Sequence, residues 1–220
     1  MEKATGGRRP RLSAEQRRES ILDAAAEVFA TSGYRATKVA DVAAKLGVTE
    51  PVIFQNFGSK AALYAAVLDR VARDIRADFQ TLDVHNGSAA ELLAHVVRPR
   101  RGAGDRSTRL HAALFTDAVA LAADETLAGP AKRAVRTVAD HFRDLVRRAQ
   151  SDGDIAAGVD PEAAAWLLLS VLAGRPGRAA AMPKRHHLEE GVSALVLSAL
   201  GLAARSDATR REHAHHPHPA

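Results

Sequence analysis

The sequence predicts an all-α protein of about nine helices, and three observations support this prediction. Alanine, the residue with the highest helix propensity, fills 47 of the 220 positions. Runs of β-branched residues that alternate with polar ones, as strands require, are scarce. Serine, threonine and aspartate recur just before apolar stretches of helical period, where helix N-termini need side-chain acceptors. The chain is 46% apolar and 26% charged, which excludes wholesale disorder.

The first four predicted helices lie between residues 13 and 79. Ser13 opens a capping-box pattern, Ser32-Gly33 ends the first helix, and Gly47 supplies the turn between the second and the third. The fourth helix carries apolar residues at steps of four as far as Phe79. The residues predicted to cap the four helices are, in order, Ser13, Thr37, Thr49 and Ser59.

Five further helices are predicted in the rest of the chain. The clearest start is Asp160-Pro161-Glu162, which combines a capping residue, a proline at the first position and an acid in the first turn. The five helices cover about 88–98, 106–123, 130–151, 161–173 and 188–204.

Several functional classes are excluded or disfavoured by composition. The chain has no cysteine, which excludes disulfide scaffolds, cysteine zinc sites and thiol nucleophiles. Its longest nearly uninterrupted apolar runs, 163–173 and 193–204, are shorter than the roughly 20 residues that span a bilayer, and no secretory signal pattern is visible. We therefore expect a soluble cytoplasmic protein without a membrane partner. No catalytic arrangement, phosphate loop or HExxH motif is present, so we expect neither an enzyme nor a cofactor.

The two short helices 38–46 and 50–56, joined at Gly47, match the helix-turn-helix pattern, in which the second helix enters the DNA major groove. Apolar residues would lock the pair together and leave a polar face on the second helix. Any two packed short helices produce this pattern, so the pattern alone also fits a purely structural pair.

The surrounding sequence resembles the TetR family of bacterial transcription regulators from Arg18 to about Val71. The residues that carry the resemblance are Ile21-Leu22-Asp23-Ala24-Ala25, Phe29, Gly33, Thr37, Asp41-Val42-Ala43, Leu46-Gly47-Val48-Thr49, Ile53-Phe54-Gln55-Asn56-Phe57 and Ser59-Lys60-Ala61-Ala62-Leu63. The resemblance implies a homodimer, usually a repressor, that binds a palindromic operator and leaves it when a small molecule binds. It also implies a helix-turn-helix DNA-binding domain at 13–58 and a helical effector-binding and dimerisation domain at 59–204.

Carried over position by position, the resemblance assigns DNA contact to the second and third helices and to the start of the fourth. The assigned residues are Thr37, Lys38, Thr49, Glu50, Pro51, Phe54, Gln55, Asn56 and Lys60. Lys60 stands in the first turn of a helix, an unfavourable place for a cation unless an anion docks there. Glu50, Pro51 and Phe54 depart from the usual family pattern. Glu50 can accept a hydrogen bond from cytosine or complement the helix dipole, and Phe54 can only stack or touch methyl groups.

The charge of the chain is concentrated at its beginning. The net charge is +5, and the first 18 residues hold six basic residues against two acidic ones. We expect residues 1–12 to form a disordered basic arm in which Arg8, Arg9 and Arg11 either follow the minor groove or add nonspecific affinity. Residues 205–220 form a His-rich tail predicted to be disordered, in which His213, His215, His216 and His218 could bind metal loosely. We expect no functional metal site there.

Dimerisation and ligand binding are expected in the C-terminal part. The segment 166–172 is apolar nearly all round its helix, so one side would pack inside the subunit and the other against a partner. The alternative is a core that lies wholly within one chain. The residues predicted at the dimer interface are Leu168, Val171, Leu172, Val192, Leu195, Val196 and Ala199. Polar and aromatic residues of the middle helices are candidates for the ligand site: Phe79, His111, Phe115, Asp117, His141, Phe142, Trp166 and Ser170.

Two rival functions remain at this point. A sequence-tolerant DNA-binding protein without an effector would take its affinity from the basic arm. A helical protein that binds a small molecule could carry a vestigial helix-turn-helix, as Glu50, Pro51 and Phe54 suggest.

Overall fold

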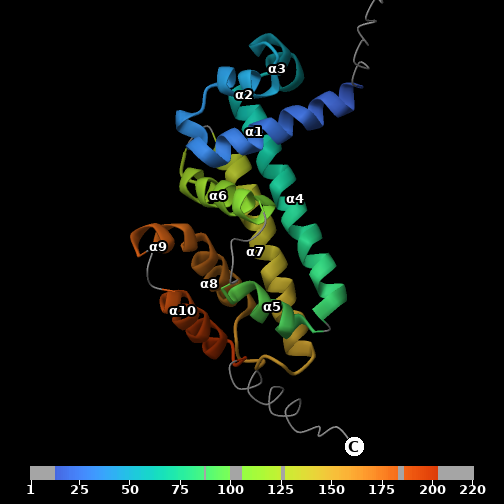
Figure 1. Ribbon diagram of the computed structural model, residues 1–220. Coiled ribbons are helices and arrows are strands. Elements are labelled where there is room, and N and C mark those ends of the chain that lie inside the picture. Colours follow the sequence, from blue (N-terminus) through green and yellow to red (C-terminus); the bar gives the residue numbers. More distant parts are fainter. Residues whose placement is uncertain (1–12, 87, 100–105, 125–126, 183–185, 203–220) are drawn as a thin grey trace, which may run out of the picture. The chain divides into compact units, whose positions relative to one another are not determined.

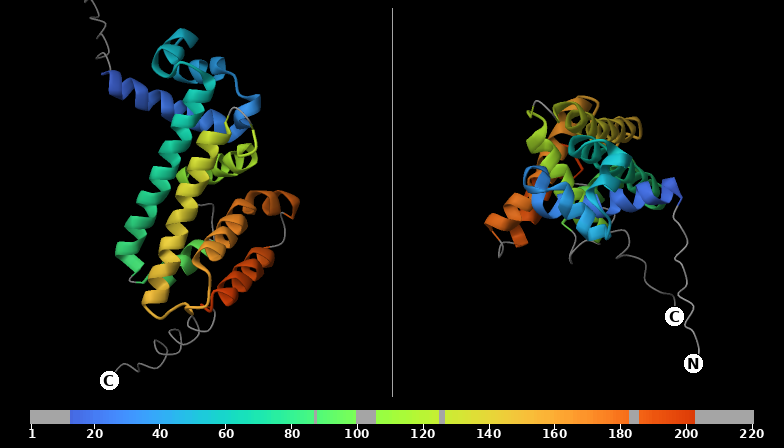
Figure 2. Two further views of the ribbon diagram at one scale, coloured as in Figure 1. Left: turned by 180° about the vertical axis from the view of Figure 1, so that it is seen from behind. Right: turned by 90° about the horizontal axis from the view of Figure 1, so that it is seen from above.

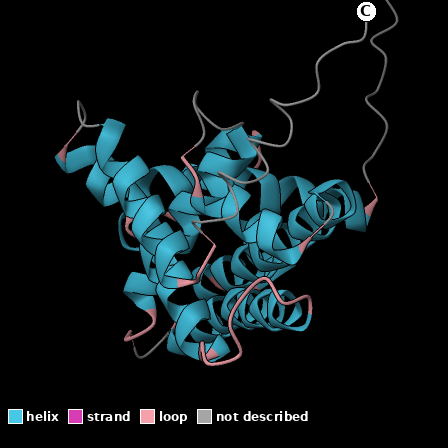
Figure 3. Ribbon diagram, turned by 90° about the horizontal axis from the view of Figure 1, so that it is seen from below, coloured by secondary structure: helices cyan, strands magenta, loops and turns pink. Residues whose placement is uncertain are grey.

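The computed structural model describes residues 13–86, 88–99, 106–124, 127–182 and 186–202. Within these ranges it contains ten helices and no strand, so the all-α prediction is confirmed. Figure 3 colours the described ribbon as helix and loop alone. The chain divides into two compact units, Met1–Val67 and Leu68–Ala220. The functional division that the sequence predicts at residues 58 and 59 stays a prediction.

The first unit contains α1 (Ala14–Ala36), α2 (Val39–Leu46), α3 (Glu50–Phe57) and the first turns of α4 (Lys60–Asn86) (Figure 1). The capping box at the start of α1 is present, because the Ser13 hydroxyl accepts from the Gln16 amide at 3.1 Å and the Gln16 side chain accepts from the Ser13 amide at 2.9 Å. Gly33 interrupts α1 with φ of +72°, which glycine adopts without strain. The buried apolar side chains include Ile21, Leu22, Phe29, Val39, Val42, Ile53, Phe57, Leu63 and Tyr64.

The second unit contains the rest of α4 together with α5 (Ala89–Val97), α6 (Arg106–Leu121), α7 (Ala128–Ser151), α8 (Pro161–Ala173), α9 (Arg175–Ala181) and α10 (His186–Ala199). The long helix α7 packs against α5, α6 and α8, and α10 lies beside α8 in both Figure 1 and the reverse view of Figure 2. Every third or fourth residue of α7 is buried, which places this helix in the centre of the unit's core. The predicted start of α8 is confirmed: Asp160 caps it and accepts from the Glu162 amide at 2.9 Å.

A polar cluster joins three helices of the second unit. Arg175 of α9 donates to the carbonyls of Val96 and Val97, which end α5, and the Ser193 hydroxyl of α10 donates to Val97 as well, at 2.7 Å. Glu189 of α10 accepts from Arg178 at 2.6 and 3.1 Å and lies 3.5 Å from Arg175. The hydrogen bonds from Arg178 hold the pKa of Glu189 below its usual value, whereas burial lowers the pKa of Arg175. The helix α9 was not anticipated from the sequence.

None of the helices in the described ranges is both long enough and apolar enough to cross a membrane.

Candidate nucleic-acid interface

The helices α2 and α3 form the pair that the sequence predicts. Gly47 ends α2 in the left-handed conformation, with φ of +71°, and the amide of Val48 donates to the carbonyl of Ala43 at 3.0 Å. Val42 and Ala43 of α2 and Ile53 of α3 are buried, so the two helices pack through their apolar sides. The opposite side of α3 is thereby left on the surface.

Five of the residues assigned to DNA contact lie on that surface. Phe54 is 42% exposed, which is unusual for a large apolar side chain and leaves its ring available to a partner. Glu50 lies in the first turn of α3, where free amide groups favour a negative charge. The exposed set is Thr49, Glu50, Pro51, Phe54 and Gln55. Their contact with DNA stays a prediction.

Thr37 requires a correction. Its side chain is only 2% exposed, and its hydroxyl donates to the carbonyl of Gly33 at 2.8 Å. It ends α1 rather than capping α2, because the residue at the N-cap of α2 is Lys38. The amide of Lys38 donates to Asp41 at 2.8 Å, while the residue itself is exposed. The contact of Lys38 with DNA stays a prediction, whereas the buried Thr37 hydroxyl already donates within its own domain.

Lys60 also has partners within its own domain. Its Nζ lies 3.5 Å from the carbonyl oxygen of Arg35 and 4.3 Å from the centre of the Tyr34 ring. Tyr34 is held in turn by Tyr64, whose ring centre is 4.9 Å away. A carbonyl dipole and an aromatic face stabilise the cation in the first turn of α4, so an anion is not needed to explain it. The position of Lys60 in a first helical turn therefore no longer indicates a bound phosphate, and its predicted phosphate contact rests on the resemblance alone.

Asn56 is half-buried and already bonded. Its side-chain amide donates to the carbonyl of Val52, one turn earlier in α3, at 2.7 Å. Its own carbonyl accepts from Arg18 of α1 at 2.8 Å. Sequence reasoning gave Arg18 no role, because the two residues are 38 positions apart and no local pattern connects them. Gln55, by contrast, is exposed, and of the two amides it is the better placed to reach a base edge. The arm residues Arg8, Arg9 and Arg11 lie outside the described residues.

Residues 21–67 match the family model described as "Bacterial regulatory proteins, tetR family". The match is confined to the first unit, so it shows a likeness to this family for that part of the chain. The activator FasR of Mycolicibacterium smegmatis, named an HTH-type transcriptional activator, is 47% identical over 68 residues. That match covers 30% of this chain and 31% of the relative, so the chain spans less than a third of the length of this curated relative.

Solved structures extend the likeness to the fold of most of the chain. A TetR-family transcriptional regulator from Cytophaga hutchinsonii has a TM-score of 0.72 and 18% identity, over 86% of this chain and 97% of that chain. The regulator FadR from Bacillus subtilis, solved in complex with stearoyl-CoA, has a TM-score of 0.62 and 18% identity, over 82% and 97%. At these identities the comparison shows a shared fold.

The polar and aromatic residues of the middle helices that were predicted to form a ligand site differ in their burial and contacts. Phe142 is part of the α7 core, and His111 is buried with its Nε2 3.7 Å from an oxygen of Asp74. Phe115, Asp117 and His141 are half-buried, and the side chain of Phe79 lies outside the described part of the chain. Their grouping around one ligand stays a prediction.

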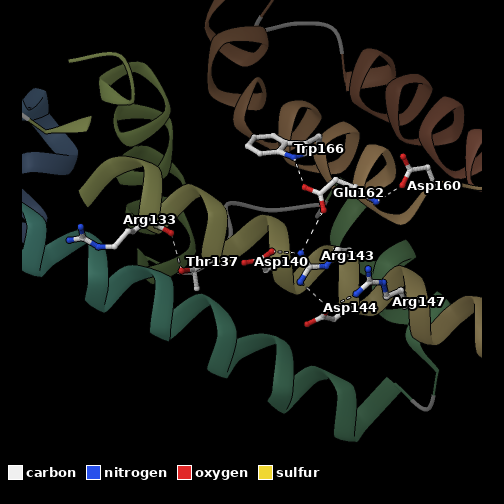
Figure 4. Close-up of polar contacts among 9 residues, drawn as sticks. All are labelled: Arg133, Thr137, Asp140, Arg143, Asp144, Arg147, Asp160, Glu162 and Trp166. Carbon is white, nitrogen blue, oxygen red and sulfur yellow. Dashed lines mark hydrogen bonds and ion pairs between the residues drawn. The ribbon is translucent and has the colours of Figure 1, made fainter. Parts of the chain in front are cut away.

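Trp166 and Ser170 require a correction as candidate walls of an enclosed site. Trp166 is 41% exposed, and its indole nitrogen donates to Glu162 at 3.0 Å (Figure 4). Glu162 also lies 3.6 Å from Arg143 of α7, so the tryptophan belongs to a surface network of charged groups. Ser170 is exposed and donates to the carbonyl of Trp166 in its own helix at 2.7 Å. Neither side chain is enclosed within the subunit.

The predicted dimer residues divide into two groups. Leu168 and Val196 are buried within the single chain, which corrects their assignment to the partner-facing side. Leu195 is 73% exposed and Ala199 is also exposed. Val171, Leu172 and Val192 are half-buried. Within the described ranges no group of three or more histidine, aspartate or glutamate side chains is arranged to hold a metal, and the His-rich tail lies outside those ranges.

Proposed function

We propose that this protein is a homodimeric transcription regulator that reads a palindromic DNA operator through α3 and leaves it when a small molecule binds. The observation that carries the proposal is the exposed face of α3, held by the Gly47 turn inside a segment that matches the TetR family. A helix in this setting can enter the major groove with its N-terminal residues toward the base edges. In a symmetric dimer the two copies would lie about 34–36 Å apart.

The surface of α8 and α10 supports the homodimer. Trp166 and Leu167 of α8 are each about 40% exposed, and Leu195 of α10 is exposed further still. The two helices lie side by side, so their exposed apolar side chains can meet the same two helices of a second copy. Such an interface is isologous, because each copy contributes the same surface.

A small-molecule effector is the third part of the proposal. The FadR structure contains stearoyl-CoA, which supports ligand binding in proteins of this fold. An effector releases DNA only if it binds the DNA-incompetent form more tightly, because equal affinity for both forms shifts nothing. The candidate contacts for this effector are polar and aromatic side chains that are buried or half-buried: His111, Phe115, Asp117 and His141.

The proposal is tested by selecting bound fragments from genomic DNA with the full chain and footprinting the protected site. We expect two inverted half-sites about one helical turn apart, protected by a dimer. Protection of one isolated half-site by a monomer would contradict the proposal. A ratio of specific to nonspecific affinity near one would instead indicate a sequence-tolerant DNA-binding protein.

Gln55 and Asn56 provide a matched pair for the same assay. Gln55→Ala should weaken binding to the selected site by about 1–3 kcal/mol, because an exposed amide at the groove would lose a base contact. Asn56→Ala should change the base preference less, because its amide is bonded to Val52. Equal loss of preference in both variants would show that α3 is oriented differently on DNA. If neither variant affects binding, the helix-turn-helix is vestigial.

Activation is the second candidate mode. The relative FasR, 47% identical over 68 residues, is named an activator. Transcription in vitro from a template carrying the selected site decides the sign: a repressor lowers the transcript as the protein is added, and an activator raises it.

A further inference from the structure

Arg18 makes two contacts with the C-terminal end of α3. Its Nη1 donates to the carbonyl of Asn56 at 2.8 Å, and its guanidinium carbon lies 4.1 Å from the centre of the Phe57 ring. Phe57 is 8% exposed, so its ring is fixed by the domain core. The guanidinium is therefore held between a main-chain oxygen and an aromatic face that belong to adjacent residues of the same helix.

Both contacts suit the chemistry of a helix C-terminus. The last carbonyls of a helix have no partner within it and carry partial negative charge, which a cation complements. A hydrogen bond from a charged donor is about twice as strong as one between neutral groups, and a cation over an aromatic ring adds to it. Arg18 is exposed, so solvent weakens both interactions. The geometry of the hydrogen bond and of the ring contact nevertheless favours one position for the end of α3.

These two contacts of Arg18 matter because few other contacts fix the orientation of α3 in the domain. It is eight residues long, too short to be stable alone, and it packs chiefly on α2, which packs on α1. Arg18 connects α3 directly to α1, whose next turn is anchored by the buried side chains of Ile21 and Leu22. The exposed residues Phe54 and Gln55 directly precede Asn56, which accepts the hydrogen bond from Arg18.

We propose that Arg18 is a positioning residue for DNA recognition. It sets the direction of α3 from the side away from the bases, without contacting DNA itself. This inference rests on the function proposed above. It differs from two simpler roles: an arginine that binds a DNA phosphate, and an arginine that only stabilises the folded domain.

The three roles differ in what Arg18→Met and Arg18→Lys do to binding by the full chain. Affinity is measured for a selected operator and for random duplex of equal length, each over a range of salt concentrations. Far-UV circular dichroism at the assay temperature gives the folded fraction of each variant. Arg17→Met, one residue earlier in α1, removes the same charge from the same turn and serves as the control.

For a positioning role, Arg18→Met lowers the ratio of specific to nonspecific affinity on the order of tenfold, because affinity for the operator falls while affinity for random duplex stays. The slope of log affinity against log salt is unchanged. Arg18→Lys, which keeps a cation able to donate to the Asn56 carbonyl, restores part of the ratio, and Arg17→Met leaves the ratio as it is.

Two results overturn the proposal. A salt slope smaller by about 0.9 with the ratio retained shows a lost phosphate contact. A ratio that stays constant in Arg18→Met and Arg18→Lys, after correction for the folded fraction, shows a role in stability alone. Failure of the proposed function is separate from both, since it would appear as an absence of operator preference in the unsubstituted protein.

Discussion

Thr37 and Lys60 show how single residues of the interface gain partners that the sequence does not reveal. The Thr37 hydroxyl donates to the carbonyl of Gly33, which also accepts from the Thr37 amide at 3.3 Å. Lys60 meets the ring of Tyr34, 26 positions earlier in the chain. Both side chains were predicted to contact DNA from the family resemblance, and their places at helix N-termini agreed with that prediction. Whether a side chain faces a duplex or its own domain depends on contacts across the fold, which caps and periodicity do not encode.

The backbone at Gly47 gives a prediction at the same scale. A Cβ added there would meet no atom within 4 Å, so Gly47→Ala is opposed only by the positive φ of the turn. We expect the free energy of unfolding to fall by about 1–2 kcal/mol, measured by urea denaturation.

Gly158 provides the matched control for that substitution. It also has no atom within 4 Å of an added Cβ, and its φ lies outside the left-handed region. Gly158→Ala should therefore be neutral or stabilise by less than about 1 kcal/mol. Equal destabilisation by the two alanines would show that the turn at Gly47 is not the source of the cost.

At the scale of elements, the sequence predicted most helices, but it predicted their ends only where the capping residue lies next to the helix. Caps that lie next to their helix, such as Ser13 and Asp160, were visible as local patterns. Arg175, which completes α5, follows that helix by more than 70 residues, and α9 lacks an apolar stripe by which it could be recognised. In the candidate interface, the exposed face of α3 was predictable from periodicity, whereas the hydrogen bond from Arg18 to the Asn56 carbonyl was not.

Glu189 gives a prediction for the junction of α9 and α10. Glu189→Gln removes the charge that faces Arg178 and Arg175, and we expect a loss of about 2 kcal/mol in the free energy of unfolding at pH 7. The pKa of Glu189 is lowered in the folded state from its ordinary value of 4.5. Its stabilisation is therefore complete above pH 4.5 and is lost as the pH falls through the folded-state pKa.

Unfolding curves of the unsubstituted protein and of Glu189→Gln between pH 3 and 8 check this dependence (about five pH values suffice to define the trend). The difference between the two should shrink at the acid end. Glu190→Gln is the control, because Glu190 faces His187 in an exposed pair at 3.3 Å and should contribute less than about 1 kcal/mol. A difference for Glu189→Gln that is independent of pH would contradict the assignment to charge.

At the scale of the whole molecule, the exposed apolar side chains of α8 and α10 predict an oligomer that a single charge can disrupt. Leu195→Glu would place two like charges near each other in a symmetric interface, each removed from water. We expect the dimer to weaken roughly a hundredfold, measured by sedimentation equilibrium. Val119→Glu, on the 39% exposed Val119 of α6, introduces the same charge elsewhere and should leave the dimer intact. Dissociation by Val119→Glu alone would move the interface to α6.

The junction that Arg175 makes with α5 has a consequence for the order in which the chain folds. A helix of nine residues does not persist in water by itself, and α5 obtains the donors for its last carbonyls from segments that are synthesised much later. On a growing chain, α5 would therefore fray until Arg175 and Ser193 have been made and have closed the long loop back to it. We therefore expect the second unit to be completed late, because α5 depends on hydrogen bonds between residues 78 to 96 positions apart, and not on the speed of helix formation.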